Sequence, residues 1–147
     1  MKKILIMCFA ITFIFFTVYT FAQKGNDTGT LKIFVNGFAN NNGKAMIALC
    51  SSEECYKDTS MAFKKDMTDI KDKKTEWLIN ELPYGTYSIS IFHDENGNNK
   101  LDKNAIGVPK EDYGFSNNAR GLFGPPDYED VKFIFDKKNM TITITVN

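Results

Sequence analysis

Short segments in which apolar and polar residues alternate constrain this chain more than any other feature of its sequence. The clearest lies at residues 86–93, where Tyr87, Ile89 and Ile91 alternate with serines. A period of two indicates a β-strand with one face in the core, and no segment has the apolar spacing of an ordinary amphipathic helix. Short turns between most strands predict an all-β fold, an antiparallel β-sandwich of about seven strands. The expected strands are residues 31–36, 45–49, 75–80, 86–93, 131–135 and 142–146.

The connection at residues 94–128 is too long to be one of these turns. It is rich in asparagine, aspartate, glycine and proline, and it has almost no periodicity. A segment of this length in a compact domain without secondary structure is usually either functional or disordered. Disordered segments generally lack large apolar side chains. We therefore expect one long ordered loop, anchored to the sandwich by Phe115, Leu122, Phe123 and Tyr128.

Residues 1–22 have the layout of a signal peptide. Two lysines precede an apolar run at 4–21, and small residues stand before a cleavage site at Gln23. The alternative is an uncleaved membrane anchor, because the run is close to the shortest that spans a bilayer. Cleavage would leave residues 23–147 as a single domain, secreted or periplasmic, with no membrane insertion.

The net charge of the chain argues against a nucleic-acid partner. The full chain has 18 basic and 18 acidic residues, so loss of the two lysines with the signal peptide leaves a net charge of −2. Such a chain lacks the basic footprint of a nucleic-acid-binding protein.

Cys50 and Cys55 follow the signal peptide, and an oxidising compartment would let them form a disulfide. The rival is half of a zinc site, for which the single histidine, His93, leaves too few ligands.

The segment at 94–102 has the spacing of a calcium-binding loop. Oxygen-bearing side chains recur there at every second position, and oxygen is the ligand that calcium takes. In such loops positions 1, 3, 5 and 9 contribute side chains, and position 7 contributes a backbone carbonyl. The predicted ligands are Asp94, Asn96, Asn98, the carbonyl of Lys100, and Asp102.

Two positions depart from the calcium-loop pattern. Position 6 is Asn99 in place of glycine, and position 12 is Ala105 in place of the bidentate carboxylate. Glu111, Asp112 or a backbone carbonyl would have to close the site, with a weak affinity of about 10⁻⁴ to 10⁻³ M. The alternative is a metal-free turn, in which the Asx side chains bond to their own backbone.

His93 continues the apolar face of the strand at 86–93, so its ring should lie where the core edge meets the long loop. A histidine in that place commonly holds a loop carbonyl, and we expect this structural role. The catalytic alternative has less support, because no nucleophile elbow surrounds Ser88 or Ser90. No pair of carboxylates stands out as a general acid and base.

A set of local motifs runs through the second half of the chain. They are Leu82-Pro83-Tyr84-Gly85-Thr86-Tyr87, His93-Asp94 with Asn96 and Asn98, Leu101-Asp102, Gly107-Val108-Pro109-Lys110-Glu111, Tyr113-Gly114-Phe115-Ser116-Asn117-Asn118, and Gly124-Pro125-Pro126. Together they resemble the secreted bacterial proteins described as domain of unknown function 2141, with Asn99 where glycine is expected. The resemblance implies location and fold class, and no activity. The turn at 82–87 also resembles transthyretin-like and carboxypeptidase-regulatory-like sandwiches, which include binding modules and a few metalloenzymes.

Three functions are compatible with these observations. The first is a non-enzymatic extracytoplasmic module, stabilised by calcium, that binds a glycan or a protein of the cell envelope. The second is an enzyme that uses the 94–128 loop as an active-site lid, with His93 and Asp94 at its hinge. A binding module should show an exposed aromatic patch, and an enzyme a concave pocket with perturbed carboxylates near His93. The third, a purely structural envelope component, should show neither.

Overall fold

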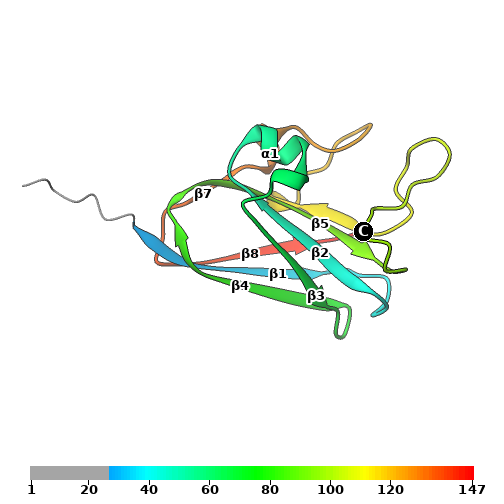
Figure 1. Cartoon of the computed structure of the whole chain (residues 1–147), viewed down its shortest axis with the longest axis horizontal. Helices are drawn as coiled ribbons and strands as arrows, with labels where there is room; N and C mark the ends of the chain where they lie inside the picture. The colour runs from blue at the N-terminus through cyan, green and yellow to red at the C-terminus, as the bar shows by residue number, and fades with distance from the viewer. Residues whose placement is uncertain (1–26) are drawn as a thin grey trace, which may run out of the picture.

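A computed structural model describes residues 27–147. These residues form two packed β-sheets, and short helices lie over one of the sheets (Figure 1). The all-β fold expected from the alternating segments is therefore confirmed. The expected signal peptide at 1–22 lies outside the described residues. Within the described part, no helix is long and apolar enough to cross a membrane.

The first sheet has three strands, in the order β4-β1-β8 (Figure 1). Strand β1 (Thr28–Asn36) pairs antiparallel with β4 (Lys74–Pro83) and parallel with β8 (Asn139–Thr145). The parallel pair departs from the fully antiparallel arrangement that we expected. It arises because the strand before β8 ends beside Gly85, at the end of the sandwich where β1 also begins.

The second sheet is built around β2 (Lys44–Cys50) and β5 (Gly85–Asp94), which pair antiparallel. Strand β3 (Lys64–Asp69) adds to the far side of β2, while β6 (Tyr113–Phe115) and β7 (Phe133–Phe135) both pair with the free edge of β5. Sequence periodicity missed β3 and β6. The first is a polar edge strand, and the second is too short to show a period.

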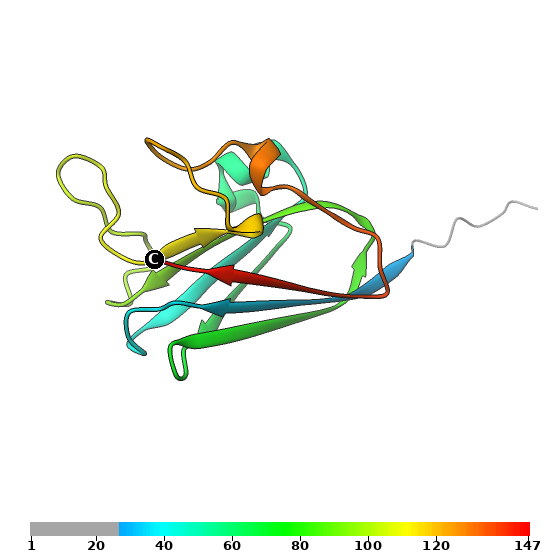
Figure 2. The ribbon, with the colours of Figure 1, turned by 180° about the vertical axis from the view of Figure 1, so that it is seen from behind.

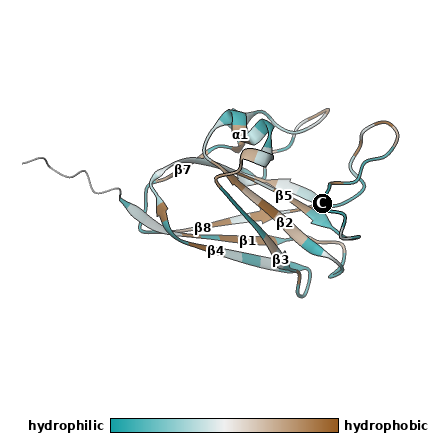
Figure 3. Cartoon of the chain, viewed as in Figure 1, coloured by the Kyte–Doolittle hydropathy of each residue, from teal (hydrophilic) through white to brown (hydrophobic). Residues whose placement is uncertain are grey.

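The core lies between the two sheets. Apolar side chains at alternate positions of β1, β2 and β5 point inward, and the hydropathy colouring shows this alternation along the strands (Figure 3). Burial of each large apolar side chain contributes roughly 1.5 to 3 kcal/mol. The residues that pack here include Leu31, Ile33, Val35, Ile47, Leu49, Ile89, Ile91 and Ile144.

Ser116 fills the gap between the two short strands on the free edge of β5. Strand β7 pairs with residues 85–87 and β6 with residues 90–92, which leaves the amide of Ile89 without a strand partner. The fully buried Ser116 hydroxyl accepts the Ile89 N–H at 2.9 Å and donates to the Val131 carbonyl. Because an unpaired buried amide is costly, this hydroxyl fixes the loop against the sheet.

Two asparagines attach the same segment to its neighbours. The side-chain amide of Asn117 donates to the carbonyls of Asp130 and Lys132, both at 2.9 Å. The side-chain oxygen of Asn118 accepts the N–H of Thr145 at 2.8 Å. Both asparagines have positive φ, which this residue type tolerates. The Asn117 bonds hold helix α2 (Tyr128–Val131) over the second sheet (Figure 2), and the Asn118 bond attaches the segment to β8.

The tip of the long loop is not anchored. Leu122 is 93 % exposed and Phe123 is 103 % exposed, so the prediction that these two side chains pack on the sandwich is wrong. Phe115 and Tyr128 are half-buried and do contact the domain. The reason is a tight turn: a Cβ at Gly121 would lie 2.2 Å from the carbonyl oxygen of Gly124, and the turn points the intervening side chains outward.

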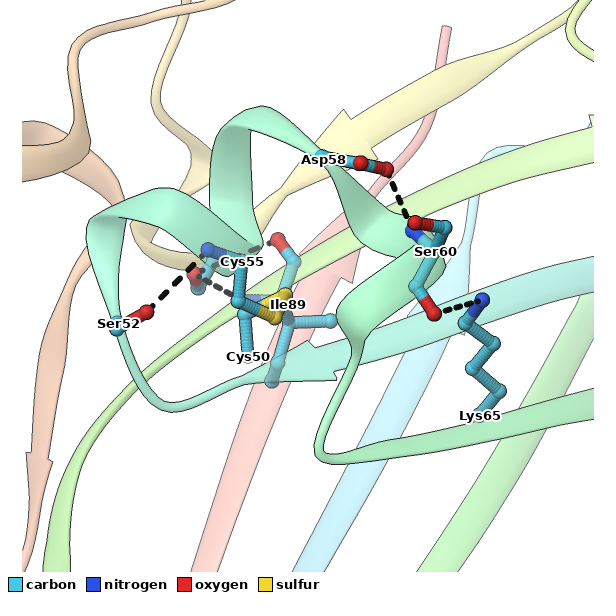
Figure 4. Close-up of a disulfide and its surroundings, with 8 residues drawn as sticks. Cys50, Ser52, Cys55, Asp58, Ser60, Lys65 and Ile89 are labelled. Atoms are coloured by element: carbon cyan, nitrogen blue, oxygen red, sulfur yellow. Dashed lines mark hydrogen bonds between the residues drawn. A yellow bond between two sulfur atoms is a disulfide. The ribbon is translucent and has the colours of Figure 1, made fainter.

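A disulfide joins Cys50, at the end of β2, to Cys55 in helix α1 (Glu53–Lys57), as predicted (Figure 4). The side chain of Ser52 caps this helix by accepting the N–H of Cys55 at 3.2 Å. The single-turn helix η1 (Thr59–Met61) follows directly. A helix this short is not stable alone, so the covalent bond holds it on the sheet.

Replacement of both cysteines, Cys50→Ser with Cys55→Ser, should lower the free energy of unfolding by about 2 kcal/mol, because the crosslink restricts a short loop of the unfolded chain. Urea denaturation of the two proteins measures the difference. Thiol labelling of unreduced, denatured wild-type protein cleaved at Gln23 should find no free cysteine. Two labelled cysteines would contradict the pairing.

Candidate functional site

The end of β5 places Asp94 at the base of the loop at 94–102. Its carboxylate is 2 % exposed and accepts the N–H groups of Gly97, Asn98 and Asn99 at 2.9, 3.0 and 2.9 Å. Asn99, which replaces the glycine of a calcium loop, has a φ of 60°. Asparagine tolerates that conformation, so the substitution preserves the turn.

The side chains of Asn96, Asn98 and Asp102 meet at the centre of the same loop. The two amide groups donate to the two oxygens of Asp102, at 2.6 Å from Asn96 and 3.0 Å from Asn98. Their own oxygens accept the N–H groups of Asn98 and Lys100 at 3.0 and 2.8 Å. These are Asx turns, so the hydrogen bonds are those of the metal-free alternative.

Glu111 closes the loop at the position that Ala105 leaves without a carboxylate. One of its oxygens accepts the N–H of Glu95 at 3.0 Å, and the other accepts the N–H of Asp102 at 2.9 Å. The side chain is buried, and it ties the beginning of the loop to its end. The structure therefore brings together the side chains of Asn96, Asn98 and Asp102, while Asp94 and Glu111 hold the backbone of the same loop.

Within residues 27–147, no three side chains of histidine, cysteine, aspartate or glutamate are placed to hold a metal ion. A cation in the loop would depend on amide and carbonyl oxygens besides the carboxylates of Asp94 and Asp102. Such ligands suit calcium better than zinc or iron, which prefer nitrogen and sulfur.

His93 has the structural role predicted for it. Its fully buried ring packs edge-on against Phe38, and its Nε2 lies 2.6 Å from the carbonyl oxygen of Asn42. Among residues 27–147 the other ring nitrogen, Nδ1, has no hydrogen-bond partner, and it faces carboxylate oxygens of Glu95 and Asp112 at 3.6 and 3.8 Å. The ring thus joins the 40–43 turn to the start of the long loop, away from solvent.

A groove of about 960 Å³ lies on the outer face of the second sheet. Ser90 and Phe92 of β5 line it, together with α1, the 99–101 part of the loop and the 125–130 segment. A second hollow of about 470 Å³ shares Ser90, Phe92, Thr59 and Asn99 with the first, so the two form one elongated surface. Its aromatic lining consists of Tyr56, Phe92, Tyr113, Phe115 and Tyr128.

Tyr56 connects the walls of this groove. Its ring centroid lies 6.0 Å from that of Tyr128 and 5.9 Å from that of Phe115. Its hydroxyl donates to the carbonyl of Pro126 at 2.7 Å. The neighbouring Cys55 fixes α1 on the sheet, so the disulfide also sets the position of this ring.

The end of the groove near Tyr56 carries negatively charged side chains. Burial raises the pKa of Tyr56 to about 12, with smaller contributions from the negative charges of Asp127 and Asp130. Among the residues that the structure describes, neither of these carboxylates has an ion-pair partner. Two other groove carboxylates do, in the pairs Glu53–Lys57 and Glu129–Lys132.

The groove residues Tyr56, Asp127 and Asp130 were missed by the reading of the sequence. They lie in two irregular segments, 51–72 and 94–131, and no periodicity relates one segment to the other. The sequence offered one local indication for Tyr56. This residue follows a cysteine of the predicted disulfide, and the bond restricts where the Tyr56 side chain can lie. Leu101 of the 94–102 loop lines the groove as well.

The comparisons with known proteins give one match. The family model described as "Uncharacterized protein conserved in bacteria (DUF2141)" matches residues 33–143, which contain the calcium-like loop and the groove. No curated protein and no solved structure matches the chain.

Alkaline titration followed by tyrosine absorbance should show Tyr56 ionising near pH 12, and Tyr56→Phe should remove that step. Asp127→Asn with Asp130→Asn should lower the pKa of Tyr56, because two negative charges are removed. The exposed Asp136→Asn serves as the control and should leave it unchanged. Because the folded protein holds this proton more tightly than the unfolded chain, the associated stability is lost as pH rises from about 10 to 12.

Proposed function

The chain belongs to the DUF2141 family of uncharacterised bacterial proteins, and on that premise we propose that it is a non-enzymatic binding module of the cell envelope. Its ligand-binding surface is the aromatic groove on the second sheet. The observation that carries this proposal is a groove of about 960 Å³ lined by five aromatic side chains. Ligand sites are typically concave, mostly apolar and of about 300 to 1,000 Å³, with a few polar groups.

Two observations support the extracytoplasmic location. The chain begins with the pattern of a signal peptide, and Cys50 is bonded to Cys55. Disulfides form and persist in oxidising compartments such as the periplasm and the extracellular space. The elongated surface suits a segment of a glycan or of a peptide chain, which are the polymers of that compartment.

The contacts of His93 and Asp94 within residues 27–147 do not favour the enzymatic alternative, in which the 94–128 loop is a lid. His93 is buried and holds the carbonyl of Asn42, while Asp94 is buried beneath three backbone N–H groups. Neither side chain lines the groove. Both residues have the contacts of structural groups at the base of a loop.

We further propose that calcium binds the loop at 94–102. Asp94 and Asp102 supply two negative charges. The amide nitrogens of Asn96 and Asn98 now point toward Asp102, and rotation of each amide group by half a turn would point its oxygen there instead. The carbonyl of Lys100 completes the predicted set. Because Asn99, Lys100 and Leu101 line the groove, a cation here would stiffen one end of the binding surface.

Calcium should raise the melting temperature. A site with a Kd of about 10⁻⁴ M in 10 mM calcium contributes about 2.7 kcal/mol, which corresponds to roughly 10 °C for a domain of this size. Asp102→Ala should abolish the shift, because it removes a ligand carboxylate. Asp94→Ala should abolish it too, but Asp94 also holds the loop backbone, so Asp102→Ala is the cleaner test.

Lys100→Ala is the matched control, since only the backbone oxygen of that residue is invoked, and it should retain the shift. Each variant is compared with itself in chelator and in calcium, so differences in basal stability cancel. Identical melting curves of the wild type in chelator and in calcium would contradict the calcium site and support the metal-free Asx turn.

The binding role is tested with one glycan probe and one peptide probe, chitohexaose and hexalysine. At least one should bind when titrated calorimetrically, and Phe92→Ala should weaken that binding about tenfold or more, because it removes an aromatic contact of the groove. Leu78→Ala, an exposed apolar truncation on β4 of the other sheet, should leave binding unchanged. Equal losses in the two variants would place the ligand elsewhere.

A further inference from the structure

The end of the groove between α1 and α2 combines aromatic rings with two carboxylates that form no salt bridge with the described residues. Tyr56 and Tyr128 lie there 6.0 Å apart, beside Asp127 and Asp130. The two carboxylates face the Tyr56 hydroxyl closely enough to raise its pKa. Both are exposed, so a ligand can reach them.

The basic residues of the groove neutralise this charge only in part. Lys57 forms its salt bridge with Glu53, at 2.6 Å, and Asp127 makes only a smaller contribution to the raised pKa of Lys57. Lys100 belongs to the calcium-like loop at another part of the lining, and among the described residues it forms no salt bridge with the groove carboxylates. A ligand that carries positive charge would therefore complement Asp127 and Asp130 without displacing an existing ion pair.

We infer that this end of the groove binds the cationic side chain of a lysine or arginine in an extended peptide. The inference rests on the proposed function, which makes the groove the binding surface. A cation within about 6 Å of an aromatic ring is attracted by the negative face of that ring, and nearby carboxylates add to the attraction. The same recognition already occurs inside the molecule, where the Arg120 guanidinium lies over the Tyr113 ring at 5.9 Å.

The ring geometry favours a cation over a sugar. Tyr56 is tilted by 43° from Tyr128 and by 71° from Phe115, so the rings do not form the flat platform on which a sugar face stacks. The Tyr56 hydroxyl already donates to Pro126, so its proton is not free for a sugar oxygen.

The inference is tested by calorimetric titration of the full mature protein with hexalysine and with chitohexaose. Hexalysine should bind, and Asp127→Asn with Asp130→Asn should weaken it about tenfold. Tyr128→Leu should weaken it as well, because the ring face is lost while the charge is kept. Added salt should weaken the wild type more than the double variant, since exposed charges are screened.

The matched control is Asp72→Asn with Asp136→Asn, which removes the same net charge at two exposed positions outside the groove. It should leave hexalysine binding unchanged. Equal weakening in the two double variants would show general attraction to an acidic protein and would overturn the inference. Binding of chitohexaose without hexalysine, lost in Phe92→Ala, would overturn it while sustaining the groove as the binding surface. If neither hexalysine nor chitohexaose binds, the result would count against both this inference and the proposed function.

Discussion

The open edge of β5 is the constraint on which the rest of the structure depends. A buried strand must satisfy its backbone groups on both edges, and β2 covers only one of them. The chain covers the other with β6, the hydroxyl of Ser116 and β7, in that order along the sequence. The 94–131 segment is therefore drawn along the second sheet. That path puts the acidic loop at one end of the sheet and Tyr128 on its outer face.

The groove exists because two weak elements are held in place by stronger ones. Helix α1 is a single turn, and the bond between Cys50 and Cys55 attaches it to β2. Helix α2 is also short, and the side chain of Asn117 holds it by donating to the carbonyls of Asp130 and Lys132. Tyr56 then joins the two helices through its ring contact and its bond to Pro126. The groove therefore needs little regular secondary structure in its own walls.

The regular strands were predictable because a period of two is a direct consequence of one-sided burial, as Tyr87, Ile89 and Ile91 show. Strand β3 was missed because an edge strand with exposed lysines on both faces has no such period. Leu122 and Phe123 were wrongly predicted to anchor the loop to the sandwich, because hydrophobicity alone does not reveal the turn from Gly121 to Gly124 that directs them outward. The disulfide was predictable because Cys50 and Cys55 have no other partner after residue 22.

The sequence by itself determined the fold class, the disulfide, the structural role of His93 and the loop in which Asn96, Asn98 and Asp102 meet. The disulfide and the loop depend on residues close together in the chain, whereas the fold class and the burial of His93 follow from the alternation of apolar positions along a strand. Only the tertiary structure decided that Glu111 closes that loop and that Tyr56, Asp127 and Asp130 share a groove. Some 70 residues separate Tyr56 from the two aspartates, and their meeting depends on how the sheets pack and on which strand edge remains to be filled.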